Sequence, residues 1–278
     1  MRACVAFIGL YGDDRYRGTG FFVTMQCEFQ PGHSFSYFVT AKHVADMLGT
    51  SPSVIRLNRR DGDALSVRLE PTTRWYFHPL NPDVVDIAVL PFAPPQDVFA
   101  YKTVPTEMFV TPEITAQRGI GIGDEVVITG LFSRLAGTKQ NVPIVRTGNL
   151  AMMPGEKVPT TFGEIDAYLI EARSIGGLSG SPVFVRETHS IAIQRENIGT
   201  VPLTGIGAHF LLGVIHGHWD LPPGAAIDAT ADQGSINMGI AIVTPATMLL
   251  EVLAQPALEA MRQEAAERFK REKAPTAD

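Results

Sequence analysis

A serine stands between glycines in the stretch Gly176-Gly177-Leu178-Ser179-Gly180-Ser181-Pro182-Val183. Glycine adopts backbone conformations that are closed to other residues, so the chain can turn tightly here and aim N–H groups at one point. A serine hydroxyl is a poor nucleophile at neutral pH and needs an adjacent base. Because the stretch alone is equally compatible with a simple Gly-rich turn, the base has to be sought elsewhere in the chain.

Two upstream patches contain the other groups that such a serine needs. His43 follows the apolar run Phe38-Val39-Thr40-Ala41. Asp86 directly precedes the apolar run Ile87-Ala88-Val89-Leu90, whereas the competing Asp83 lies three residues earlier. A histidine can take the serine proton, and a buried carboxylate can hold the histidine tautomer and stabilise the imidazolium. The order along the chain is therefore His, Asp, Ser.

These patches, with Gly18-Thr19-Gly20-Phe21-Phe22-Val23 ahead of the histidine, resemble the trypsin/chymotrypsin-like serine peptidases. Within that family they are similar to the disulfide-poor bacterial branch that includes the Htr-type stress proteases. The resemblance covers roughly residues 5 to 250. It implies an all-β fold of two antiparallel Greek-key β-barrels (chymotrypsin-like) with C-terminal helices.

The resemblance also implies an activity and a catalytic site. The activity is that of a serine endopeptidase, which hydrolyses peptide bonds through an acyl-enzyme, with a polypeptide as the partner. The implied catalytic triad is His43, Asp86 and Ser179. The implied oxyanion hole consists of the backbone N–H groups of Gly177 and Ser179.

Four substrate-binding residues follow from the same resemblance. Arg173, six residues before the nucleophile, falls at the base of the primary pocket with Ser174 beside it, and His216 and Gly217 fall on the strand that pairs with the substrate backbone. Arg173 could pair with a substrate carboxylate, which predicts a preference for Asp or Glu before the scissile bond. Alternatively, it turns away to pair with Glu171 or another acid and leaves a small apolar pocket that prefers Val, Ala or Leu.

Two positions depart from the family pattern. Leu178 stands where zymogen-derived digestive enzymes carry the acid that receives a freed N-terminus, so activation by that ion pair is not expected. Ser181 replaces the more usual glycine, a change familiar in bacterial members. We expect no metal, because His216 and His218 have no evident third ligand, and no cofactor. No PDZ-like module is expected after residue 250.

The layout of short apolar runs predicts three regions. Strand-like runs with turn residues between them recur over most of the chain, and a Pro-rich passage extends from Pro91 to Pro112. We expect an N-terminal barrel over residues 1–105, a second barrel over 106–250, and a C-terminal helix and tail over 251–278. In the last region Leu258, Met261, Ala265 and Phe269 form one apolar helix face. This helix either lies on the body of the protein or binds a partner or a second copy.

Composition excludes several classes of protein. A formal net charge of −6 argues against a sequence-independent nucleic-acid binder. No apolar run is long enough to span a membrane. Two cysteines, Cys4 and Cys27, cannot build a disulfide framework. The first residues faintly resemble a signal peptide, but Asp13-Asp14-Arg15 follows instead of a cleavage region, so we expect a cytoplasmic protein.

Two functions of other classes remain open at this point. One is a catalytically silent protein-interaction module of the same fold, in which the barrels or the terminal helix form a binding surface. The other is an esterase that uses the same three residues. Labelling by a fluorophosphonate distinguishes the peptidase from the silent interaction module. Panels of peptide and ester substrates distinguish it from the esterase.

Overall fold

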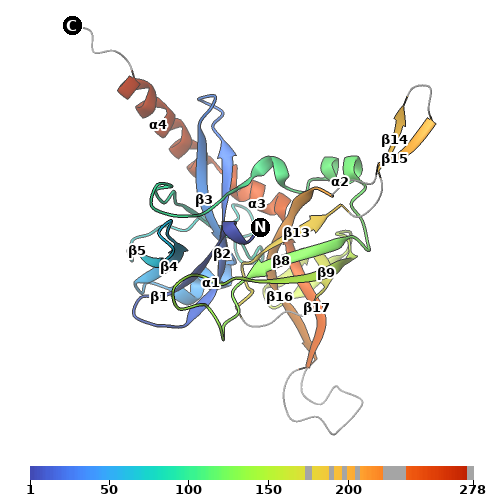
Figure 1. The fold of residues 1–278 in the computed structure, drawn as a ribbon, viewed down its shortest axis with the longest axis horizontal. Helices are drawn as coiled ribbons and strands as arrows, with labels where there is room; N and C mark the ends of the chain where they lie inside the picture. Colours follow the sequence, from blue (N-terminus) through green and yellow to red (C-terminus); the bar gives the residue numbers. More distant parts are fainter. Residues whose placement is uncertain (173–176, 188–190, 196–198, 204–206, 222–235, 274–278) are drawn as a thin grey trace.

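The structure is a computed structural model that describes residues 1–172, 177–187, 191–195, 199–203, 207–221 and 236–273 (Figure 1). Two bodies of β-structure lie side by side, with two helices at the C-terminal end of the chain.

The first body is a sheet of six antiparallel strands and a short seventh strand that pairs in parallel. Its strands are β1 (Val5–Leu10), β2 (Tyr16–Gln26), β3 (Ser34–Thr40), β4 (Ser53–Asn58), β5 (Ala64–Leu69), β6 (Ala88–Pro91) and β7 (Val104–Pro105). The hydrogen-bonded order is β5-β4-β1-β2-β3-β6, and β7 pairs with β2. The ring of Phe38 lies against Gly20 on the neighbouring strand, where any side chain at Gly20 would collide with it.

The second body is a closed barrel of six strands. They are β8 (Glu125–Gly130), β9 (Ile144–Met152), β12 (Tyr168–Glu171), β13 (Pro182–Arg186), β16 (His209–Leu221) and β17 (Ile236–Pro245). The ring closes in the order β12-β17-β16-β13-β8-β9. Two hairpins extend from it, β10 (Lys157–Thr160) with β11 (Gly163–Asp166), and β14 (Ile191–Arg195) with β15 (Gly199–Leu203).

Short helices connect or flank the two bodies. They are α1 (Lys42–Leu48), α2 (Pro112–Arg118), α3 (Ala246–Leu253) and α4 (Pro256–Lys273), with 3₁₀ turns at Arg2–Cys4 and Thr106–Met108. The Thr111 hydroxyl caps α2 by accepting from the N–H of Ile114, and Gly119 ends that helix in a left-handed conformation with φ of 64°. The predicted fold class, β-barrels with C-terminal helices, is confirmed.

The largest core cluster joins the first sheet to the C-terminal helices. Leu249, Leu253 and Leu258 of α3 and α4 belong to the same buried cluster as Phe7 and Phe21 of the first sheet. A separate cluster fills the second barrel. The first cluster also contains Phe184, Leu211 and Val214 of the second barrel, so the C-terminal helices pack where the two bodies meet.

The prediction for the last helix is wrong by part of a turn, because its buried face differs from the predicted apolar face. Leu258, Arg262 and Ala266 are buried, at spacings of four residues, whereas Met261 and Phe269 are exposed. An arginine takes the central buried position because its guanidinium finds two acceptors there. Its Nη1 donates to the Tyr37 hydroxyl oxygen at 3.1 Å and to the Leu253 carbonyl at 2.8 Å.

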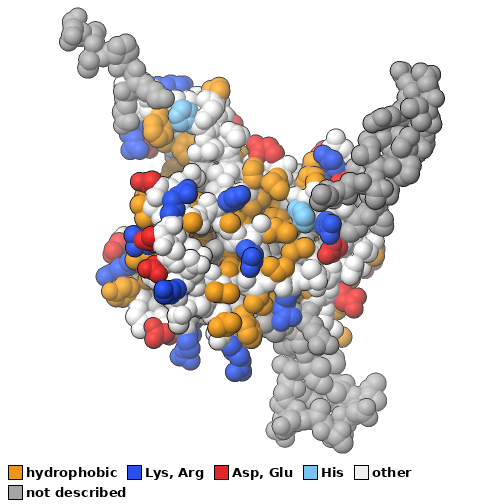
Figure 2. Space-filling view, in the orientation of Figure 1, with side chains coloured by type: hydrophobic (Ala, Val, Ile, Leu, Met, Phe, Trp, Pro, Cys, Tyr) orange, Lys and Arg blue, Asp and Glu red, His pale blue; other side chains and the backbone are white. Residues whose placement is uncertain are grey.

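Cys4 and Cys27 are both free and buried, and burial raises the pKa of the Cys4 thiol to about 12. No helix within the described part of the chain is long and apolar enough to cross a membrane. On the face shown in Figure 2, hydrophobic side chains gather near the centre, and basic and acidic ones are interspersed around them.

Arg262→Ala is expected to lower the free energy of unfolding by about 2–4 kcal/mol, because it leaves a cavity and two buried acceptors without their donor. The control is Lys270→Ala on the exposed side of the same helix, which should change it by less than about 0.5 kcal/mol. Urea unfolding followed by circular dichroism measures both. Equal effects of the two substitutions would contradict the buried role of Arg262.

Candidate active site

His43 lies in the first turn of α1, immediately after the core strand β3. Its backbone N–H donates to Asp86 Oδ1 at 2.8 Å, and its ring Nδ1 lies 2.7 Å from Asp86 Oδ2. Because an ionised carboxylate can only accept hydrogen bonds, Nδ1 carries the proton in this pair. Nε2 is then left with a free lone pair, which is the form that a general base requires.

Asp86 sits in the loop between β5 and β6, with its side chain 1% exposed. The buried side chains of Val85 and Ile87 fix the loop on both sides of it. The same loop is tied to the C-terminal helices, since His78 Nε2 lies 2.9 Å from Glu251 Oε2 on α3. Asp83, the competing carboxylate, is exposed and forms no hydrogen bond or ion pair with His43 among the described contacts.

Ser179 occupies a turn that both bodies hold in place. Its carbonyl accepts from the N–H of Thr19 on β2 at 3.0 Å, and the next N–H, that of Gly180, donates to the carbonyl of Ile215 on β16 at 3.0 Å. Gly180 has φ of +79°, and a Cβ there would collide with the Thr19 carbonyl and the Thr40 hydroxyl. Glycine is therefore required after the serine for two reasons, backbone conformation and space.

Thr19 connects this turn to its surroundings through its hydroxyl as well. The hydroxyl donates to the Gly177 carbonyl at 2.8 Å and accepts from the N–H of Leu131 at 2.8 Å. The Thr19 carbonyl in turn accepts from the Thr40 hydroxyl at 2.7 Å. One buried threonine of the first sheet thus fixes the backbone on both sides of Ser179 in the second barrel.

The expected oxyanion hole involves the backbone of Gly177 and Ser179, which lie in the same turn. Gly177 has φ of +99°, and neither its N–H nor that of Ser179 donates to another described residue. Two such N–H groups are what a developing oxyanion needs. Arg173 and Ser174, expected at the base of the primary pocket, lie outside the described residues.

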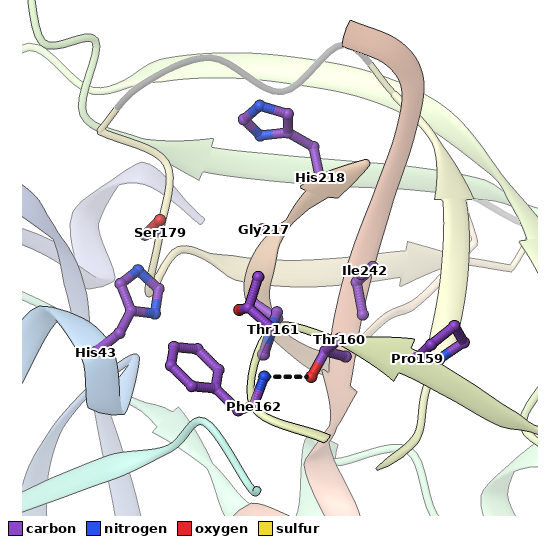
Figure 3. A pocket seen from close by; sticks show the side chains of 10 residues that line it. His43, Pro159, Thr160, Thr161, Phe162, Ser179, Gly217, His218 and Ile242 are labelled. Carbon is purple, nitrogen blue, oxygen red and sulfur yellow. Dashed lines mark hydrogen bonds between the residues drawn. The ribbon is translucent and has the colours of Figure 1, made fainter. Parts of the chain in front are cut away.

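Ser179 and His43 open into one pocket of about 520 Å³ (Figure 3). The described residues that line it are His43, Pro159, Thr160, Thr161, Phe162, Ser179, His216, Gly217, His218 and Ile242. No hydrogen bond joins the Ser179 hydroxyl to His43 among the described contacts. Such bonds are often long without substrate and tighten in the complex. Two of the three groups expected at the site, His43 and Ser179, therefore line one cavity, and Asp86 is hydrogen-bonded to His43 behind it.

The arrangement of strands identifies the fold. The MamO protease domain from Magnetospirillum magneticum (apo form) matches over 91% of this chain and 97% of that chain, with a TM-score of 0.53 and 14% sequence identity. The chain has the chymotrypsin-like fold. Rv3671c from M. tuberculosis H37Rv, an alanine mutant in an inactive form, matches over 91% of this chain and 87% of that chain, with a TM-score of 0.45 and 17% identity. No family model matches the chain, and no curated protein matches its sequence.

His216 lies closer to the carboxylate than the sequence indicated. We expected it on a substrate-binding strand, and it does line the pocket, but its Nδ1 also lies 3.3 Å from Asp86 Oδ2. The angle falls short of a hydrogen bond, so this nitrogen has no partner in the structure. Burial lowers the pKa of His216, the Asp86 carboxylate offsets part of that effect, and His43 lowers it further. The Asp86 carboxylate thus has a second imidazole beside it, in addition to that of His43.

Phe162 is a residue that sequence reasoning missed. It lies at the turn of the β10–β11 hairpin, with its ring stacked on His43 at a centroid distance of 6.1 Å and edge-on to His216 at 5.4 Å. The sequence around it, Thr160-Thr161-Phe162-Gly163, shows a turn but does not reveal which surface the turn meets. Within the described residues, no cluster of His, Cys, Asp or Glu is suited to hold a metal ion.

Asp86→Asn should reduce turnover of a peptide substrate about ten-thousandfold, because the amide favours the wrong imidazole tautomer. Asp83→Asn removes an exposed carboxylate three residues away and should leave turnover within about twofold of wild type. Steady-state kinetics on one fluorogenic peptide compares them. A larger effect of Asp83→Asn than of Asp86→Asn would show that Asp83, and not Asp86, orients His43.

His216 should make the stability of the protein depend on pH. Since its folded-state pKa lies below the ordinary 6.5, the unfolded chain binds the proton first, and the free energy of unfolding falls as the pH drops from about 6.5 through the folded pKa. His216→Asn removes this titration, so it should lose less stability than wild type between about pH 7.5 and about pH 5. Urea unfolding at both pH values measures the difference. Equal losses of stability in the wild-type protein and the His216→Asn variant would show that His216 does not have a lowered pKa in the folded state.

Proposed function

We propose that the protein is a serine endopeptidase in which Ser179 is the nucleophile, His43 the general base and Asp86 the group that orients His43. The observation that carries this proposal is the pairing of His43 with a buried Asp86 at the edge of the pocket that Ser179 also lines. Such a pair holds the imidazole in the tautomer that can accept the serine proton.

The proposed reaction has two stages, formation of an acyl-enzyme and its hydrolysis. The Ser179 Oγ attacks the scissile carbonyl carbon while its proton passes to His43 Nε2, and the negative charge that develops on the carbonyl oxygen faces the N–H groups of Gly177 and Ser179. His43 then gives the proton to the leaving amine as the C–N bond breaks. Water repeats both steps on the acyl-enzyme and frees the acid.

The edge of β16 supports a polypeptide as the substrate. β13 pairs with β16 only over His209 to Val214, and the last backbone bonds on that side go to Ile215. Beyond it, no described strand pairs with that edge at His216 and Gly217, although β17 still pairs with the other edge. An extended peptide can add to such an edge through its own backbone hydrogen bonds. This edge borders the pocket that contains Ser179.

Ser179→Ala should abolish labelling by a fluorophosphonate and reduce peptide hydrolysis on the order of a millionfold. Ser181→Ala is the matched control: it removes a serine two residues away whose buried hydroxyl has no hydrogen-bond partner in the structure. That variant should keep both labelling and hydrolysis. Mass spectrometry of the labelled peptide and a cleavage profile on denatured protein measure the two effects.

The outcomes separate the candidate functions. Labelling together with cleavage of peptides supports the endopeptidase. Labelling with turnover of esters and no cleavage of any peptide would identify an esterase that uses the same residues. A folded wild-type protein that is not labelled would overturn the catalytic proposal in favour of a silent interaction module.

A further inference from the structure

The loop that carries Asp86 is long and has no helix or strand of its own. It connects β5 to β6 over residues 70–87. One β-bridge closes its base, because the backbone N–H groups of Tyr76 and Val89 each donate to the other residue's carbonyl at 2.8 Å. A loop of this length takes its geometry from contacts with its surroundings. The position of the carboxylate that orients His43 therefore depends on what holds the middle of the loop.

Three side-chain hydrogen bonds join this loop to the C-terminal helices. They link three consecutive loop residues to α3, to the junction between α3 and α4, and to α4 itself. The Tyr76 hydroxyl donates to Met261 Sδ at 3.2 Å, Gln255 Nε2 donates to the Phe77 carbonyl at 3.3 Å, and His78 Nε2 lies 2.9 Å from Glu251 Oε2. The helices thus hold the loop at successive positions along one short segment.

His78 continues this connection toward Asp86. Its Nδ1 accepts from the backbone N–H of Asn81 at 3.0 Å, so the proton of the neutral ring is on Nε2, which donates to Glu251. The Asn81 carbonyl accepts from the N–H of Val85 at 3.0 Å, and Asp86 is the next residue. The His78 side chain is only 3% exposed, so water does not readily replace these partners. A continuous chain of hydrogen bonds runs from α3 to the residue before Asp86.

Glu251 is not needed to pack the helices against the body. Its side chain is 55% exposed, whereas Leu249 and Leu253 of the same helix are fully buried and belong to the core cluster. Among the described residues, His78 is the hydrogen-bond partner of its carboxylate. Replacing Glu251 therefore removes one end of the hydrogen-bond chain and leaves the core intact. The effect on Asp86 can be separated from an effect on folding.

We propose that Glu251 and His78 are positioning residues for Asp86, and that the C-terminal helices hold Asp86 against His43 through this pair. The consequence for turnover rests on the proposed function, whereas the consequence for the hydrogen bond between His43 and Asp86 does not. Neither Glu251 nor His78 lines the pocket that contains Ser179. The pair therefore acts on the orientation of the base and not on the binding of substrate.

Glu251→Ala tests the proposal in the full chain. It should lower kcat for a peptide substrate about 10- to 100-fold, because a misplacement of about 1 Å from a distant substitution can cost about 100-fold. KM should stay within about twofold of wild type, because uniform substrate binding is untouched. Glu251→Gln keeps an oxygen that can accept from His78 Nε2 and should restore most of the lost kcat. Glu264→Ala removes an exposed carboxylate from α4 and is the matched control, with kcat and KM unchanged.

The ring Nδ1–H of His43 gives a second readout that requires no turnover. With isotope-labelled histidine, a proton held between His43 and Asp86 gives an NMR signal, which is assigned by its loss in His43→Ala. Glu251→Ala should broaden this signal, because a loosened loop exposes the proton to exchange with water. Glu251→Gln and Glu264→Ala should keep it sharp.

The two readouts separate the possible failures. A Glu251→Ala variant with wild-type kcat and a sharp His43 signal would overturn the proposal, even if the variant unfolds more easily, since the pair would then serve stability alone. Equal losses of kcat in Glu251→Ala and Glu264→Ala would overturn it as well. Wild-type protein that a fluorophosphonate does not label defeats the proposed function, and the NMR comparison still decides whether Glu251 positions Asp86.

Discussion

The hydrogen bonds between Thr19 and the Ser179 turn are the constraint on which the candidate site depends. His43 lies in α1 and Asp86 in a loop, both of the first body, whereas Ser179 lies in a turn that leads into β13 of the second. Their geometry is therefore set by how the two bodies meet. Thr19 meets the turn through its backbone N–H and its hydroxyl, on both sides of the serine. Gly180 allows this close approach because it has no side chain to collide with Thr19. A small shift between the bodies would therefore separate His43 from Ser179.

Burial of the Asp86 carboxylate is costly unless it is compensated, and the structure compensates it locally. An unpaired charge in a low-dielectric interior loses its hydration, and hydrogen-bond donors must replace it. The backbone N–H and ring Nδ1 of His43 supply two donors. Neutral His216 occupies the remaining side without adding a second charge. The Asp86 carboxylate is thus hydrogen-bonded to the His43 ring, and the His216 ring lies 3.3 Å from it.

Local patterns allowed much of this structure to be predicted. Strands such as β3 (Ser34–Thr40) and β8 (Glu125–Gly130) consist of β-branched and aromatic runs between turns, which are a local signal. The carboxylate nearest His43 could be selected because Asp86, unlike Asp83, directly precedes a core run. By contrast, the contact of Phe162 with His43 depends on where a hairpin of the second barrel meets the first body. The buried face of the last helix could not be predicted either, because the acceptors for Arg262 come partly from Tyr37, far away in the chain.

The position of the C-terminal helices has a consequence for synthesis of the chain. Leu249, Leu253 and Leu258 share a core cluster with Phe7 and Phe21, so the first sheet emerges from the ribosome long before the residues that cover it. Until then an apolar surface stays open to solvent, and Glu251 is not yet available to His78 in the loop that carries Asp86. The contact between Glu251 and the loop that carries Asp86 therefore forms only after α3 has been synthesised. A chain that lacks the two helices exposes an apolar surface of the kind that chaperones and proteases recognise.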